Sequence, residues 1–310
     1  MSRPPATATA LRAQHRAETL ALRLPPLLVA AERVAATVAQ GVHGRRRVGT
    51  GESFWQFRRY QPGDSAQMID WRQSAKNRHV FVRENEWEAA QSVWIWRDDS
   101  ASMDWRSDRD LPTKRERADL LALALAVLLV RGGERVALLG SGVAPSAARS
   151  ILPRLALHLT GPAAAAGGRD TGSDAGRDGD GVPPVEALPR HARIVLVGDL
   201  LGPLERVQAT VAAYANRGLR GHLVQVLDPA EETLPFGGRV EFTGLEGEAE
   251  LLVPRVEGIR DAYLERLAAQ KTGLSDLARA AGWSYSVHCT DRPAQVPLLS
   301  LWGALAQEAV

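Results

Sequence analysis

From residue 91 onward, short apolar runs of strand length alternate with helix-like segments, and this alternation limits the fold more than any other feature of the chain. The strand-like runs are SVWIW, RVALLG, RIVLVGD, GHLVQVLD and WSYSVHC. Before the first helix, Thr113 and Glu116 have the spacing of a capping box, in which each side chain satisfies a free backbone N–H. Strands that alternate with helices form βαβ units. The sequence therefore predicts an α/β fold with a mostly parallel sheet and helices on both faces.

This sheet domain is expected to cover residues 91–310, and two other parts precede it. Residues 1–43 have the pattern of N-terminal helices, with a proline pair that separates two helical segments. Residues 44–90 are dense in arginine and aromatic residues and look irregular, apart from a strand-like run at 79–85. We therefore expect an N-terminal helical part and an irregular basic module in front of the sheet.

Two segments inside the sheet domain do not fit the alternation. A hairpin-like insertion is expected over residues 237–253. The segment 161–181 is rich in Gly, Ala and Asp and has no large apolar residue, so it cannot bury enough surface to offset the entropy of ordering. We expect a disordered loop there.

The chain of 310 residues has a net charge of only +2, but this value hides an asymmetry. Residues 1–85 contain 14 Lys and Arg against 6 Asp and Glu, and the remainder contains 24 against 30. The single cysteine, Cys289, excludes an intrachain disulfide, and the first residues lack the apolar region of a secretory signal. The apolar run 120–130 is too short to span a bilayer. We expect a cytoplasmic protein without a membrane partner.

Small oxygen-bearing side chains follow two of the predicted strands. Asp98, Ser100 and Ser102 come directly after the first strand, and Asp199 follows the third. Ligands gather at the carboxyl ends of parallel strands, so these side chains are expected to meet in space. Carboxylate and hydroxyl oxygens suit Mg²⁺ or Mn²⁺, although Asp and Ser after a strand are also common in turns and helix caps. We predict a weak site for Mg²⁺ or Mn²⁺ with one position open to an acidic group from outside.

The segment DDSASM resembles the Asp-x-Ser-x-Ser metal-ion-dependent adhesion site (MIDAS) of von Willebrand factor A domains. This resemblance implies a von Willebrand A-like, Rossmann-type domain in which Asp98, Ser100, Ser102 and Asp199 hold the metal. Such a site also uses a threonine from a loop, and the available residues are Thr160 and Thr171.

A longer stretch, residues 49–77, resembles the signature of the bacterial family catalogued as domain of unknown function 58. Its pattern falls on Gly49, Gly51, Glu52, Phe54, Arg58, Tyr60, Pro62, Gly63, Asp64, Ile69, Asp70, Trp71, Arg72, Ser74 and Ala75. The chain departs from this pattern at Gln67 and Lys76, where the family usually has arginine. The resemblance implies a protein that is often associated with MoxR-type AAA+ ATPases and serves the assembly or activation of a client, or the insertion of its metal.

We therefore expect a non-enzymatic, metal-assisted protein-interaction module that acts as an adaptor for such an ATPase. No nucleophile–base pair is visible, because His288 and Cys289 are neighbours on a strand and point to opposite faces. The alternative is nucleic-acid binding by the segment 45–83, where arginines alternate with aromatic residues. The opposite charges of the two parts favour packing of this segment on the sheet domain instead.

Overall fold

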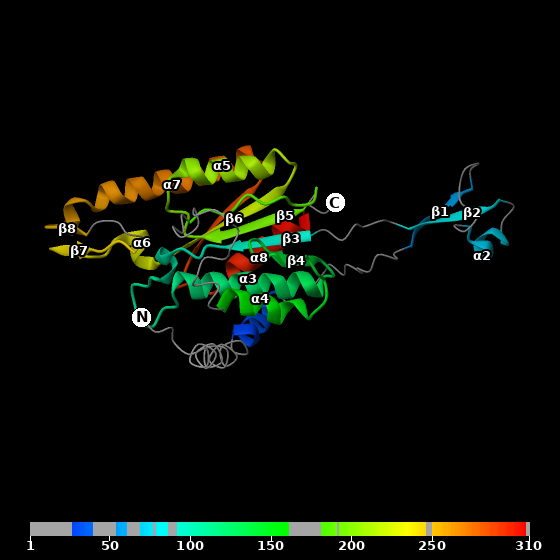
Figure 1. Ribbon diagram of the computed structural model, residues 1–310, viewed down its shortest axis with the longest axis horizontal. Coiled ribbons are helices and arrows are strands. Elements are labelled where there is room, and N and C mark those ends of the chain that lie inside the picture. The colour runs from blue at the N-terminus through cyan, green and yellow to red at the C-terminus, as the bar shows by residue number, and fades with distance from the viewer. Residues whose placement is uncertain are drawn as a thin grey trace, which may run out of the picture.

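The computed structural model describes residues 27–39, 54–60, 69–76, 79–85, 92–160, 181–190, 192–245 and 250–307. Its centre is a five-stranded sheet in the order β4-β3-β5-β6-β9, in which every pairing is parallel (Figure 1). The strands are β3 (Ser92–Arg97), β4 (Arg135–Leu138), β5 (Arg193–Gly198), β6 (Arg220–Leu227) and β9 (Ser284–Cys289). The predicted α/β class with a mostly parallel sheet is confirmed.

The order of the strands reverses between β3 and β5. The chain adds β4 on one side of β3, then crosses to the other side and adds β5, β6 and β9 outward. The loops after β3 and β5 therefore leave the sheet next to each other and turn to opposite faces. In open parallel sheets this reversal point is where ligands bind.

Helices cover both faces of the sheet (Figure 1). One face carries α3 (Lys114–Arg131), α4 (Ile151–Thr160) and α8 (Gln295–Gln307), and the other carries α5 (Leu204–Ala215) and α7 (Arg260–Ala280). Strands β3, β5 and β6 contribute to both cores because their side chains alternate: Val195 and Val197 of β5 belong to the first core, and Ile194 and Leu196 to the second. The predicted capping box of Thr113 and Glu116 is present at the start of α3.

A helix over residues 27–39 also belongs to the first core. Ala31, Val34, Ala35 and Val38 recur at helical spacing, are buried, and pack in the same cluster as α3 and α8. This helix therefore shares a hydrophobic core with the sheet domain, although about 50 residues of chain lie between them.

The segment 44–90 contains a small β-unit. β1 (Phe54–Arg59) pairs antiparallel with β2 (Phe81–Asn85), and the short α2 (Trp71–Ser74) lies between them in sequence. The sequence reading missed β1 because a bulge between Phe54 and Gln56 breaks the two-residue alternation. Ser74 Oγ holds α2 against β2: it accepts from the Phe81 N–H at 2.9 Å and donates to the Asp70 carbonyl at 2.7 Å.

The unit of β1, β2 and α2 lies apart from the five-stranded sheet in Figure 1. The side chain of Trp71 is 67% exposed, and Arg72 and Lys76 are exposed as well. The expectation that the aromatic residues of this segment pack on the sheet domain is therefore wrong for Trp71. Opposite net charge of two parts does not by itself specify which surfaces meet.

The predicted insertion after β6 is a hairpin at the carboxyl end of the sheet (Figure 1). It follows α6 (Pro229–Thr233) and consists of β7 (Val240–Phe242) and β8 (Leu251–Val253). A third, small core ties it to α7, with Leu234, Val253 and Val256 buried and Tyr263 packed against them. The disordered loop predicted over 161–181 lies outside the described residues, except for Gly181.

Candidate functional site

The loop after β3 is held in a fixed conformation by its own first carboxylate. The Asp98 N–H still donates to Val197 of β5 at 2.8 Å, which continues the sheet by one residue. Asp98 Oδ1 then accepts from the Ser100 N–H at 2.9 Å and turns the chain into a short 3-10 helix, η2 (Ala101–Asp104). Arg115 of α3 donates to the carbonyls of Asp99 at 3.0 Å and Ser100 at 2.9 Å. The backbone that carries the Asp-x-Ser-x-Ser motif is thereby fixed on both sides.

The structure brings together all four described residues that the sequence proposes as metal ligands. Ser100 Oγ lies 3.0 Å from Ser102 Oγ, and Ser102 Oγ donates to Asp199 Oδ2 at 2.7 Å. Asp98 is fully buried beside them, and Asp199 is 5% exposed. They meet where the strand order reverses, with Asp98 after β3 and Asp199 after β5.

The two carboxylate oxygens of Asp98 differ in their surroundings. Within the described residues, Asp98 Oδ2 is buried and forms no hydrogen bond. Burial, and next the negative charge of Asp199, raise the pKa of Asp98 to about 6. The close approach of β5 requires glycine at position 198, because a Cβ there would lie 2.8 Å from the Asp98 Cβ and 2.9 Å from Oδ2.

Lys114 is a site residue that sequence reasoning missed. Its side chain is 1% exposed, and its Nζ lies 2.8 Å from Asp199 Oδ2 and 2.6 Å from Glu231 Oε1 of α6. Burial alone would lower the pKa of Lys114, but the charges of Asp199 and Glu231 outweigh it and raise that pKa. Burial raises the pKa of Glu231, which Lys114 only partly offsets. A lysine at the first position of a helix is ordinarily exposed, so no local signal marked it.

The turn after β5 is supported from two neighbouring strands. Gln225 of β6 donates to the Asp199 carbonyl at 2.8 Å, and Tyr285 of β9 donates to Gln225 Oε1 at 2.5 Å. Leu200 has a positive φ of 49°, an unusual conformation for a residue with a branched side chain. These features hold the backbone of the turn that carries the Asp199 carboxylate.

The oxygens of the site fit a small divalent cation. Two carboxylates and two hydroxyls are hard ligands of the kind that Mg²⁺ prefers, and Ser102 already lies within hydrogen-bond distance of both Ser100 and Asp199. Asp199 and Glu231 share a single ammonium group, that of Lys114. No cluster of three or more His, Cys, Asp or Glu suited to a metal occurs among the described residues, so hydroxyls and water would complete the coordination.

The two threonines considered as further ligands have different outcomes. Thr160 Oγ1 donates to the Ala156 carbonyl at 2.9 Å in the last turn of α4, so its hydroxyl is used within its own helix. Thr171 lies outside the described residues. Gly181, at the end of the same connection, lies beside the site: a Cβ there would be 3.4 Å from Asp98 Oδ2.

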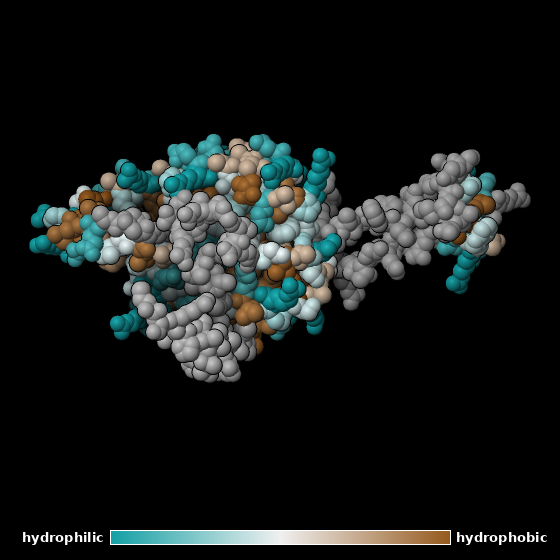
Figure 2. Space-filling model, viewed as in Figure 1, coloured by the Kyte–Doolittle hydropathy of each residue, from teal (hydrophilic) through white to brown (hydrophobic). Residues whose placement is uncertain are grey.

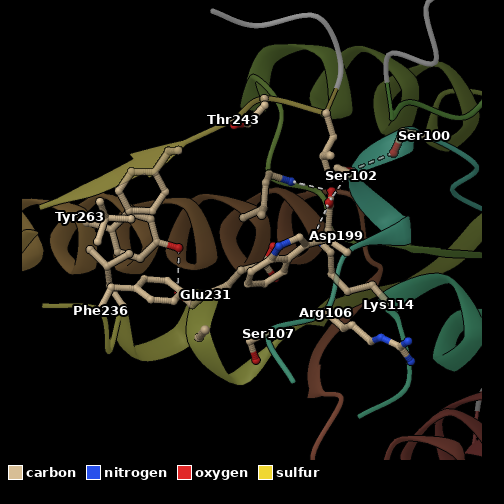
Figure 3. A pocket seen from close by; sticks show the side chains of 18 of the residues that line it. Ser100, Ser102, Arg106, Ser107, Lys114, Asp199, Glu231, Phe236, Thr243 and Tyr263 are labelled. Carbon is tan, nitrogen blue, oxygen red and sulfur yellow. Dashed lines mark hydrogen bonds and ion pairs between the residues drawn. The ribbon is translucent and has the colours of Figure 1, made fainter. Parts of the chain in front are cut away.

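A cavity of about 830 Å³ opens next to these oxygens (Figure 3). Ser100, Ser102, Lys114 and Asp199 line one end. The rings of Phe236 and Tyr263 lie at the other end, from the insertion and α7. The remaining lining includes Trp105, Arg106, Leu234, Val240, Phe242 and Leu245. The cavity therefore connects a polar end, suited to a cation or a charged group, with an apolar end.

This chain is similar to one protein family and to uncharacterized proteins of mycobacteria. The profile of the family described as "Protein of unknown function DUF58" matches residues 56–273. The uncharacterized proteins Mb1516 of Mycobacterium bovis and Rv1480 of Mycobacterium tuberculosis are each 28% identical over 266 residues, which cover 82% of this chain and 80% of theirs.

Two solved structures from Bacteroides are similar at low identity. The conserved hypothetical protein BatB of Bacteroides thetaiotaomicron has a TM-score of 0.39 and 14% identity, over 70% of this chain and 99% of that one. An aerotolerance-related membrane protein of Bacteroides fragilis has a TM-score of 0.35 and 14% identity over the same shares. The second structure is that of a membrane protein, and the cytoplasmic location expected from the sequence is withdrawn. Among the described residues, every helix is too short or too polar to cross a membrane.

Proposed function

We propose that this chain, which belongs to the family of proteins of unknown function DUF58, is a non-enzymatic protein-interaction module with a von Willebrand A-like fold. It uses a bound Mg²⁺ or Mn²⁺ ion to recognise an acidic group of its partner. In this role it is an adaptor between a MoxR-type AAA+ ATPase and a client protein that is assembled or activated.

One observation carries the proposal: Asp98, Ser100, Ser102 and Asp199 converge where the strand order reverses. Buried carboxylates are costly unless a cation or hydrogen bonds compensate them. Asp98 Oδ2 has no hydrogen-bond partner among the described residues, and this side chain is fully buried. A solely structural aspartate would be expected to use both of its oxygens. The von Willebrand A-like assignment is supported by the motif and by the parallel sheet with helices on both faces.

Asp98, Ser100, Ser102 and Asp199 would hold the ion, which supplies a positive position for an acidic ligand when bound. The chain's own contribution is to fix these oxygens before binding. Asp98 is held by the Ser100 N–H, and Arg115 holds the carbonyls of the loop. Lys114 balances part of the negative charge at Asp199 and Glu231. The adjacent cavity gives a partner group access to the site.

Titration calorimetry with Mn²⁺ tests the metal site. The wild type should bind Mn²⁺ weakly, and Asp98→Ala should abolish the binding. Asp99→Ala is the matched control. It also removes one carboxylate, but from the exposed position next to the buried Asp98. No Mn²⁺ binding at millimolar concentration, or equal binding by wild type and Asp98→Ala, would overturn the proposal.

The adaptor role is tested by co-purification with a MoxR-type ATPase of the same organism. A complex in the presence of Mg²⁺ that is lost in Asp98→Ala supports the role of the metal site in this contact. A complex that forms equally with both proteins would place the ATPase contact elsewhere on the chain.

One observation favours the alternative of nucleic-acid binding by the segment 45–83. Trp71 is 67% exposed and is followed by the exposed Arg72, a combination that can stack on a base and contact a phosphate. Binding to single-stranded oligonucleotides should then fall steeply with salt and be lost in Trp71→Ala. Binding below detection at low salt would exclude this alternative.

A further inference from the structure

The hairpin insertion forms the wall of the cavity opposite the acidic site, and it does so with a continuous run of residues. Every residue from Val240 to Leu245 lines the cavity. In a strand, successive side chains point to opposite faces, so a cavity that lies over one face is lined by every second residue. All three residues of β7 and the three that follow it line the cavity, which is the pattern expected where the edge of a strand, with its backbone groups, faces a cavity.

This edge of β7 is open among the described residues. β7 pairs with β8 on one side, through Val240–Val253, Glu241–Leu252 and Phe242–Leu251, and the sheet has two strands. A strand at the edge of a sheet presents unpaired N–H and C=O groups that can pair with another chain. A short exposed edge beside a cavity is the geometry by which proteins add a peptide as an extra strand.

Apolar side chains lie on both strands of the hairpin and next to them. Phe242 packs edge-to-face on Phe236, with ring centroids 6.1 Å apart. Leu245, Leu251 and Leu252 are 49%, 60% and 45% exposed. Apolar side chains are visible at the end of the molecule formed by β7 and β8 in Figure 2.

We propose that the insertion binds an extended segment of a partner protein, which adds to the edge of β7, places an apolar side chain against Phe236 and Phe242, and directs an acidic side chain toward Asp199. The acidic end rests on the proposed metal site, whereas the strand addition rests on the β7 edge alone. The two halves of one cavity would thus recognise two chemically different features of the same segment.

The test is a selection of displayed random heptapeptides on the full chain in the presence of Mn²⁺. The best peptide is then synthesised and its affinity measured by fluorescence anisotropy. Enriched peptides should combine an acidic residue with aliphatic or aromatic residues. Methylation of alternate backbone nitrogens should lower the affinity at least tenfold, whereas methylation of the intervening ones should have little effect, because only every second N–H of an added strand pairs with β7.

Leu245→Asp should lower the affinity at least tenfold. Leu299→Asp is the matched control, since Leu299 is 46% exposed but lies on α8, away from the insertion. No enrichment, an affinity that is equal in Leu245→Asp and Leu299→Asp, or a methylation pattern without alternation would overturn the inference. If binding shows the alternation and the Leu245 effect but is insensitive to EDTA and to Asp98→Ala, the strand addition stands and the proposed metal-dependent function fails.

Discussion

The substitution Lys114→Met tests whether Lys114 forms a buried ion pair whose loss costs more stability than the loss of a surface ion pair. Lys114 is 1% exposed and lies between Asp199 at 2.8 Å and Glu231 at 2.6 Å. Methionine fills a similar volume but leaves two largely buried carboxylates without their cation. Removing one partner of a buried pair typically costs about 3–5 kcal/mol. For a domain of this size, that corresponds to a decrease in Tm of roughly 6–20 °C.

Urea and thermal unfolding in the presence of EDTA measure this cost. The matched control is Lys271→Met: Lys271 of α7 binds the neighbouring Glu232 of α6 at 2.8 Å, but the two side chains are 28% and 23% exposed. A partly exposed pair of this kind contributes about 0–1 kcal/mol. A loss of stability in Lys114→Met no larger than in Lys271→Met would refute the assignment of Lys114 as the cation that compensates this site.

The pH dependence of the same variant gives a second check. Burial already raises the pKa of Glu231, and the loss of Lys114 removes the charge that lowers it. An acid with a raised pKa takes up its proton more readily in the folded state, so the stability of Lys114→Met should rise as pH falls below neutral. Lys114 of the wild type keeps its proton over this range, because its pKa lies above the ordinary 10.5. The difference in free energy of unfolding between the wild type and Lys114→Met should therefore decrease as the pH falls. A difference that stays constant would contradict this account.

Four other substitutions test three other parts of the structure. Gly198→Ala should weaken Mn²⁺ binding in calorimetry, because its Cβ would lie 2.8 Å from the Asp98 Cβ; an unchanged affinity would contradict the geometry. Burial, and next the charge of Arg193, lower the pKa of His222 to about 4, so His222 contributes stability that is full above pH 6.5 and is lost as pH falls through 4. In urea unfolding, the difference in free energy of unfolding between the wild type and His222→Asn should thus grow by up to about 3 kcal/mol from pH 4 to neutral pH. A difference that does not change with pH would contradict this role of His222. Trp71→Ala should change the free energy of unfolding by less than about 0.5 kcal/mol, whereas Ser74→Ala should cost about 1 kcal/mol through its two hydrogen bonds; equal effects would be inconsistent with an exposed Trp71.

Much of the sheet domain follows from local pattern. The apolar runs of strand length, the capping box at Thr113 and Glu116, and the helical periods between them decide which segments form strands and helices, because these signals act over a few residues. The meeting of Asp98 and Asp199 also follows, since each residue ends a parallel strand and such ends share one edge of the sheet. The bulged strand β1 escaped this reading because its alternation is interrupted.

Other features were decided by tertiary structure alone. Lys114 stands next to a capping threonine and has the local pattern of an exposed residue, yet packing buries it against Asp199, 85 residues away, and Glu231, 117 residues away. The residues of β7 line the cavity because α6 and α7 fix the direction of the insertion, which the pattern of its own residues does not specify. Periodicity encodes which face of an element is buried. Which side chain meets which across the fold depends on how the elements pack, and that information is not local to any stretch of the chain.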